Sequence, residues 1–157
     1  MGSIATVFVL TLFCVTLFIH DVWACSCINL DNYSKYCQAE FAVKAYVVKE
    51  KWSTPHGDRV YRIVTDVKGL RTLKGNFGNV DLTKVYTASD VGMCGVILQP
   101  GKVYLLLGYI DKSKTPHRLR ILLCDWIQMW DTLTLAEKSF VRQGYLTGCH
   151  SKLLNVV

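Results

Sequence analysis

Residues 41–51 read FAVKAYVVKEK. Valine, alanine, phenylalanine and tyrosine predominate in this segment, which is typical of a β-strand. The cluster STPHGD at residues 53–58 is rich in turn-forming residues and predicts a reversal of the chain. Residues 60–68 then place Tyr61, Ile63, Thr65 and Val67 on one face and Arg62, Asp66 and Lys68 on the other. These two segments predict a sheet with one buried face.

Three further strands are predicted downstream. Residues 74–79 contain two glycines and interrupt the chain before an alternating strand at residues 80–87. Residues 103–110 are apolar on both faces and therefore predict a central strand. Residues 117–124 follow a polar hairpin loop and predict the fifth strand. The connection between the third and fourth strands, residues 88–101, is long and irregular and contains Cys94.

Two short helical segments complete the predicted elements. Thr134 and Glu137 form a capping box, in which each side chain satisfies a free backbone N–H, and Gly144 is placed to end that helix. Residues 31–37 are polar and predict one helical turn. The sequence therefore predicts a mainly β protein: a five-stranded oligonucleotide/oligosaccharide-binding-type (OB) β-barrel with a C-terminal helix.

The first 24 residues differ from the rest of the chain. They contain no Lys or Arg, and residues 7–19 form one apolar run that is too short to span a bilayer. We therefore predict a signal peptide, residues 1–24, cleaved after Ala24; the alternatives are an uncleaved anchor and a buried core helix. Cleavage would remove Asp21 and raise the net charge from +6 to +7. The sequence thus predicts a secreted protein without a membrane segment after cleavage.

Cysteine content agrees with secretion. Cleavage would remove Cys14 and leave six of the seven cysteines, an even number that predicts three disulfides in an extracellular domain. Six cysteines allow 15 pairings, and only those that join the close neighbours Cys25 and Cys27 are disfavoured. A zinc site is the weaker alternative, because no second close pair of Cys or His accompanies this one.

The sequence offers little support for catalysis. Only His56, His117 and His150 remain after cleavage, no G-x-S-x-G motif is present, and oxidised cysteines supply no thiolate nucleophile. We therefore expect that the protein is not an enzyme and has no cofactor of its own. Secretion disfavours nucleic acid as a partner.

Two groups of basic residues lie near the predicted hairpins. They are Lys49, Lys51, Arg59 and Arg62 in one group, and Lys112, Lys114, Arg118 and Arg120 in the other. One interpretation is a set of solvated strand faces; the other is a surface for sulfated glycosaminoglycans. A separate sequon, Asn32-Tyr33-Ser34, predicts N-glycosylation at Asn32.

The sharpest feature is the predicted mature N-terminus, Cys25-Ser26-Cys27-Ile28. Two crosslinks within three residues would hold an end of the chain that normally frays. A rigid α-amine and the neighbouring carbonyl oxygen of Cys25 would form a pair of ligands for an external zinc ion. The alternative is a terminal crosslink with no other purpose.

With these features the chain resembles the tissue inhibitors of metalloproteinases, specifically their N-terminal, netrin-like domain. One shared element is the C-x-C pair directly after a predicted signal peptide, with nine residues between Cys27 and Cys37. The others, in chain order, are Ala39-Glu40-Phe41, Val60-Tyr61, Tyr86-Thr87, Cys94-Gly95, Cys124, Trp130-x-x-Leu133-Thr134-Leu135 and Gly148-Cys149. The resemblance covers residues 25–149, and six cysteines at matching spacing make it specific.

The resemblance implies a fold, a set of disulfides and a mechanism. The implied pairs are Cys25–Cys94, Cys27–Cys124 and Cys37–Cys149. It also implies inhibition of zinc metalloendopeptidases of the matrix metalloproteinase type by a monomer whose Cys25 chelates the catalytic zinc of the target through its α-amine and carbonyl. The residues expected to contact the protease are Cys25, Ser26, Cys27, Ile28, Asn29, Asp90, Val91, Gly92, Met93 and Cys94.

Two departures from the family pattern bear on these expectations. The segment Asp90-Val91-Gly92-Met93 does not follow the residues expected before the fourth cysteine, which affects target preference. Residues 150–157 are expected to be a short tail, so that residues 25–149 form a single-domain inhibitor without the six-cysteine C-terminal domain of the family. The alternative function is a non-inhibitory netrin-like module that binds glycosaminoglycans or matrix proteins.

Overall fold

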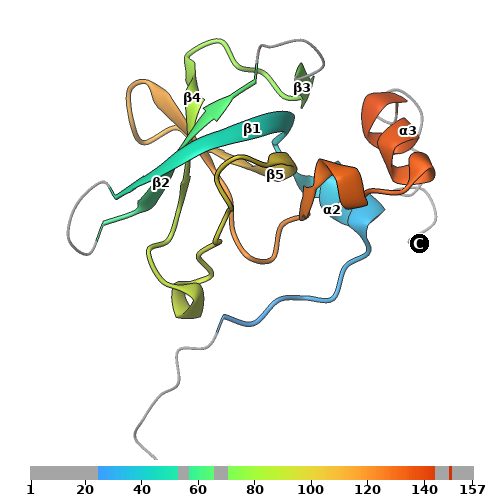
Figure 1. Ribbon diagram of the computed structural model, residues 1–157, viewed down its shortest axis with the longest axis horizontal. Helices are drawn as coiled ribbons and strands as arrows, with labels where there is room; N and C mark the ends of the chain where they lie inside the picture. Colours follow the sequence, from blue (N-terminus) through green and yellow to red (C-terminus); the bar gives the residue numbers. More distant parts are fainter. Residues whose placement is uncertain (1–24, 53–56, 66–70, 144–148, 150–157) are drawn as a thin grey trace, which may run out of the picture.

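The computed structural model describes residues 25–52, 57–65, 71–143 and 149. Its elements follow one another along the chain and are shown in Figure 1. They are α2 (Asn32–Gln38), β1 (Phe41–Trp52), β2 (Arg59–Val64), β3 (Arg71–Lys74), β4 (Val80–Thr87), η1 (Val91–Met93), β5 (Val103–Asp111), β6 (His117–Arg120), β7 (Ile127–Met129), η2 (Trp130–Thr132) and α3 (Leu135–Gln143). The predicted signal peptide and Gly144 lie outside the described residues.

Five of the strands close into a barrel in the order β1-β2-β4-β6-β5, and β5 returns to pair with β1. All of these pairings are antiparallel except that of β4 with β6, which is parallel. β3 adds to β1 outside the ring, and β7 adds to β5. The mainly β, five-stranded OB-type barrel that the sequence predicts is therefore confirmed.

Several predicted boundaries were wrong in detail. β3 was not predicted, because its four residues include only one large apolar side chain. β7 has three residues, too few to show an alternating pattern. The fifth predicted strand ends at Arg120 rather than Cys124. The predicted single helical turn at residues 31–37 is instead the seven-residue helix α2, which ends at Gln38. Its N-cap Asp31 accepts a hydrogen bond from the backbone N–H of Ser34.

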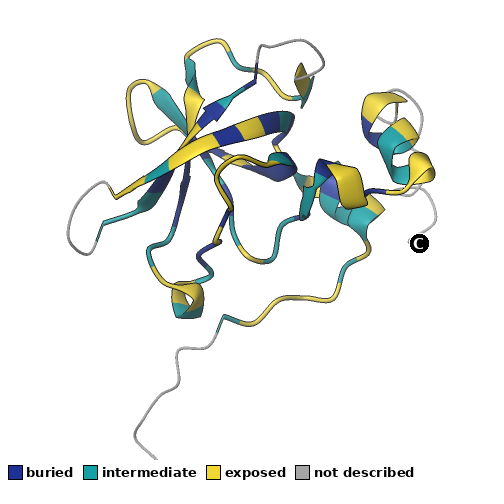
Figure 2. Ribbon diagram, viewed as in Figure 1, coloured by how far each residue is buried: buried dark blue, intermediate teal, exposed yellow. Residues whose placement is uncertain are grey.

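Two hydrophobic cores explain why residues 103–110 are apolar on both faces. Val43 and Leu106 belong to the core inside the barrel. Their neighbours Ala42 and Leu105 point outward, into a second core formed with α2, η2 and α3. Figure 2 shows the corresponding change along β1, from mostly buried residues near Phe41 to mostly exposed residues near Trp52, the end that the helices do not cover.

The capping box of α3 is present, and it also connects the two helices. The carboxylate of Glu137 accepts hydrogen bonds from the backbone N–H and the hydroxyl of Thr134, both at 2.8 Å. The amide of Asn32 in α2 donates to the other oxygen of Glu137 at 3.2 Å. These helices have seven and nine residues, so no helix in the described part of the chain is long and apolar enough to cross a membrane.

Candidate functional site

Three segments from distant parts of the sequence meet at one edge of the barrel. They are residues 25–30, residues 90–95 around η1, and residues 122–125 between β6 and β7. Disulfides join the first segment to each of the others, as Cys25–Cys94 and Cys27–Cys124. We call these three segments together the N-terminal edge. In Figure 1, residues 25–30 run as an extended trace below α2 toward η1.

The two bridges of the N-terminal edge lie against each other. The Sγ atoms of Cys25 and Cys124, which belong to different bridges, are 3.9 Å apart. Cys25, Cys94 and Cys124 have the separation of a metal cluster, but all three sulfurs are oxidised and provide no thiolate ligand. The compact sulfur group therefore holds residues 25–27 in place, and its oxidised sulfurs are not metal ligands.

The third bridge lies apart from this edge. Cys37 in α2 pairs with Cys149, so this bridge fixes Cys149 to α2 across a separation of 112 residues. The three pairs are those that the family resemblance implies. Three structural disulfides indicate a protein that folds in an oxidising compartment.

Residues 26–29 are exposed, in agreement with a segment that contacts a partner. Ile28 is 80% exposed, which is unusual for a large apolar side chain. The only backbone hydrogen bond described for residues 25–30 is local, from the N–H of Leu30 to the carbonyl of Ile28. Behind this segment, a groove of about 410 Å³ separates it from Tyr109 of β5 and from α2. The bridges, rather than sheet pairing, hold residues 25–29 at the barrel.

The second segment forms a tight, apolar projection. Its departure from the family pattern has a local structural role, because the carboxylate of Asp90 accepts a hydrogen bond from the N–H of Gly92 at 2.7 Å and caps η1. Cys94 ends the turn with φ 63°, in the left-handed region. Val91 and Met93 are 45% and 56% exposed, so the segment presents apolar side chains beside the bridge.

Gly95 lets this turn close against the preceding strand. A Cβ atom at this position would lie 2.2 Å from the carbonyl oxygen of Ala88 and 2.6 Å from that of Asp90. The N–H of Gly95 also donates to the Asp90 carbonyl at 2.9 Å. The Cys94-Gly95 pair of the sequence is thus a requirement of close packing.

Gly95→Ala is expected to lower the free energy of unfolding by about 1–3 kcal/mol, because the backbone must move to admit the methyl group. The shift would also displace Cys94, so partner binding at the edge should weaken as well. Gly78→Ala is the matched control, since its Cβ would meet nothing closer than 3.8 Å. Urea unfolding of both variants provides the measurement, and equal stabilities would contradict this account of Gly95.

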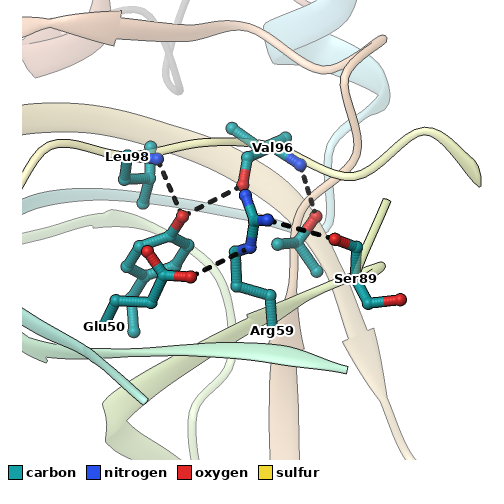
Figure 3. Close-up of polar contacts among 7 residues, drawn as sticks. Glu50, Arg59, Ser89, Val96 and Leu98 are labelled. Carbon is teal, nitrogen blue, oxygen red and sulfur yellow. Dashed lines mark hydrogen bonds and ion pairs between the residues drawn. The ribbon is translucent and has the colours of Figure 1, made fainter. Parts of the chain in front are cut away.

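Buried polar groups anchor the second segment to the barrel (Figure 3). The hydroxyl of Tyr61 in β2 donates to the carbonyl of Val96 at 3.2 Å and accepts from the N–H of Leu98 at 3.0 Å. The hydroxyl of Thr87 accepts from the N–H of Val96 at 3.0 Å. Burial raises the pKa of Tyr61, so the phenol stays protonated and keeps its donor.

An ion pair supports the other end of the same segment. The guanidinium of Arg59 contacts the carboxylate of Glu50 at 3.1 Å and donates to the carbonyl of Ser89 at 3.1 Å, as Figure 3 shows. Arg59 also stacks on Trp52, with its Cζ 4.7 Å from the ring centroid. The residues before and after η1 are therefore both fixed to the sheet.

Asp125 shapes the third segment. Its carboxylate accepts a hydrogen bond from the N–H of Leu122 at 2.7 Å, and its own N–H donates to the Leu122 carbonyl at 3.0 Å. Burial raises the pKa of Asp125, an effect that the hydrogen bond and Lys35 partly oppose. The N–H of Leu123 donates to the Cys94 carbonyl at 2.9 Å and so ties this turn to the second segment.

Sequence reasoning missed one exposed apolar residue of this edge, Leu123, and a second one just beyond it, Ile97. Ile97 and Leu123 are exposed apolar residues, each within three positions of a bridge cysteine. Their position would follow from the disulfide pairing but not from local sequence. Asn32, the predicted glycosylation site, is half-buried at the start of α2, and its side-chain amide donates a hydrogen bond to Glu137.

The fold and its edge define a class of protein: a three-disulfide OB barrel that presents an exposed, crosslinked chain segment. The profile of the family described as "Tissue inhibitor of metalloproteinase" matches residues 23–157. The chain belongs to this family. It is 32% identical over 136 residues to "Metalloproteinase inhibitor 2" of Rattus norvegicus and of Homo sapiens, which covers 83% of this chain and 60% of each relative.

A further relative, "Metalloproteinase inhibitor 2" of Gallus gallus, is 31% identical over 136 residues, or 83% of this chain and 60% of that protein. The chain therefore spans about 60% of the length of these relatives.

Proposed function

We propose that this protein is a secreted inhibitor of zinc metalloendopeptidases, of the matrix metalloproteinase type. The observation that carries the proposal is the N-terminal edge: an exposed segment, residues 25–29, crosslinked at its first and third positions beside an apolar turn. The names of the relatives point to the same activity.

In the proposed mechanism, cleavage after Ala24 makes Cys25 the first residue. Its α-amine nitrogen and carbonyl oxygen then bind the catalytic zinc of the target and displace the water required for hydrolysis. The zinc is part of the protease, and the inhibitor needs no cofactor of its own.

The exposed residues around Cys25 would contact the protease on both sides of its zinc. Ser26, Cys27, Ile28 and Asn29 would lie along the primed side of the cleft, with the side chain of Ser26 at the mouth of the specificity pocket. Their backbone N–H and C=O groups have few internal partners and could pair with a strand of the protease. The second segment of the N-terminal edge would pack alongside and contact the protease as well, through Asp90, Val91, Gly92, Met93 and Cys94.

The direct test is inhibition of a matrix metalloproteinase catalytic domain by the secreted protein, after N-terminal sequencing has established its first residue. Tight, stoichiometric inhibition by protein that begins at Cys25 supports the proposal. Protein with that terminus that leaves such proteases fully active would contradict it and would favour a non-inhibitory module.

The pH dependence of inhibition tests the chelating amine. An α-amine has an ordinary pKa of about 7.7–8.0, and only its neutral form can bind zinc. Below that pKa, protonation opposes binding by about 1.4 kcal/mol per pH unit, so inhibition should weaken roughly 40-fold from pH 8 to pH 6. The inhibition constant is measured across this range and corrected for the pH profile of the protease alone. An affinity that stays level or rises on acidification would contradict amine chelation.

A further inference from the structure

One outer face of the barrel carries aligned cations that the sequence does not reveal. Lys49 of β1 lies opposite Arg62 of β2, and Arg62 lies opposite Lys84 of β4. All three side chains are exposed. Neighbouring strands are about 4.8 Å apart, so these cations form a row about 10 Å long across three strands.

A second group of cations lies further along β1. Lys44 of β1 faces Arg71 of β3 across the pairing of these strands. The ammonium of Lys44 lies 4.5 Å from the centroid of the Trp130 ring, and the guanidinium of Arg142 in α3 lies 5.5 Å from it. The side chain of Lys138 is close enough to act on Lys44 as well.

Lys44 and Lys49 are five positions apart on the same strand, about 15 Å at strand spacing. Side chains five positions apart on a regular strand point to opposite faces, but a β-bulge between Val47 and Lys49 shifts the alternation and leaves Lys49 opposite the outward-facing Arg62. The two groups therefore form one surface. We call this surface the basic stripe. Its members are Lys44, Lys49, Arg62, Arg71, Lys84, Lys138 and Arg142.

Few carboxylates balance the basic stripe. Among the ion pairs between described residues, only that of Lys84 with Asp81, at 2.9 Å, involves a member of the stripe. Burial lowers the pKa of Lys44, and the neighbouring cations Arg142, Arg71 and Lys138 lower it further, against the opposing effect of Asp131. Like charges directly opposite on neighbouring strands destabilise a sheet. The folded protein therefore holds a local excess of positive charge that a bound anion would relieve.

Other basic residues near the hairpins do not contribute equally. Arg59 is paired with Glu50, and both terminal nitrogens of Arg120 contact Asp58, at 2.9 Å and 2.6 Å. These arginines are half-buried and already neutralised. Arg118 stacks on Tyr86, with its Cζ 4.6 Å from the ring centroid. The basic stripe thus shares only Lys49 and Arg62 with the two groups seen in the sequence, and its other members are brought together by the fold.

We propose that the basic stripe binds a sulfated glycosaminoglycan chain. A linear polyanion fits a surface that is long and positively charged. Three disulfides are typical of a secreted protein, and sulfated glycans are the most highly charged linear polyanions that such a protein meets outside the cell. None of the stripe residues belongs to the N-terminal edge. Binding of a glycan and of a protease are therefore expected to be compatible.

The test compares two double variants that remove the same charge. Lys49→Ala/Arg62→Ala removes the centre of the basic stripe, and Lys112→Ala/Lys114→Ala removes two exposed lysines from the turn between β5 and β6. Binding to a size-defined heparin oligosaccharide is measured at 0.15 M NaCl, with thermal melting as the check on folding. We expect about a tenfold loss of affinity for the stripe variant and less than a twofold loss for the control.

The remaining outcomes have defined meanings. Equal losses in both variants, or no binding by the unaltered protein, would overturn the proposal. Binding to desulfated heparin as tightly as to heparin would also overturn it, as would preference for anionic phospholipid vesicles or for DNA over heparin. Inhibition of a protease should be unchanged in the stripe variant. Since heparin binding does not depend on inhibition, failure of either proposal leaves the other testable.

Discussion

One additional alanine before Cys25 is expected to abolish protease inhibition while the domain stays folded. The extension converts the α-amine into an amide nitrogen, which has no lone pair available for zinc. It also places extra atoms where the zinc would lie. We expect the affinity for the protease to fall about a thousandfold, which corresponds to a loss of about 4 kcal/mol in binding free energy.

The measurement is the inhibition constant of the Ala-extended protein, with mass spectrometry to establish its terminus. The folded state is checked by thermal melting, which should be unchanged because residues 26–29 are exposed. Lys114→Ala is the control, since it alters an exposed residue in the turn between β5 and β6, outside the N-terminal edge, and keeps the amine free. Full inhibition by the extended protein would show that Cys25 does not chelate the zinc.

The barrel could be predicted from the sequence because its strands have strong local patterns. Residues 103–110 are apolar on both faces, and the structure uses both, with Leu106 inside the barrel and Leu105 beneath the helices. β3 and β7 lack such a pattern, since they are held by pairing to longer strands rather than by their own side chains. Short elements at the margin of a sheet depend on tertiary contacts that a local pattern does not contain.

The site was predictable only in part. Exposure of Ser26 and Ile28 follows from their place beside an expected chain end, but the sequence alone left most of the 15 cysteine pairings open. The anchor of the second segment was also hidden, because Tyr61 meets the backbone of Leu98 at a separation of 37 residues. Nothing in the local sequence separates Tyr61 from any other aromatic residue on a buried strand face.

The sequence also does not show which basic side chains are paired with an acid in the folded protein. Arg59 and Arg62 are three residues apart and equivalent by composition. The structure pairs Arg59 with Glu50 and leaves Arg62 in a row with Lys49 and Lys84. Strand register therefore decides which basic side chains can bind an external anion.

Removal of single disulfides should separate stability from inhibition. Cys37–Cys149 and Cys25–Cys94 close chain segments of 112 and 69 residues. The loss of either bridge is expected to lower the free energy of unfolding by about 4–5 kcal/mol, because the unfolded chain gains freedom. The double variants Cys37→Ala/Cys149→Ala and Cys25→Ala/Cys94→Ala are compared by urea unfolding.

Inhibition should respond to only one of these changes. The Cys25→Ala/Cys94→Ala variant keeps an α-amine and a carbonyl at position 25, but residues 25 and 26 lose their attachment to η1. Ordering two free residues costs about 3 kcal/mol, so the affinity for the protease should fall about a hundredfold. The Cys37→Ala/Cys149→Ala variant should inhibit normally below its melting temperature, since its bridge lies outside the N-terminal edge. Equal inhibition by both variants would mean that the protein does not depend on a rigid Cys25.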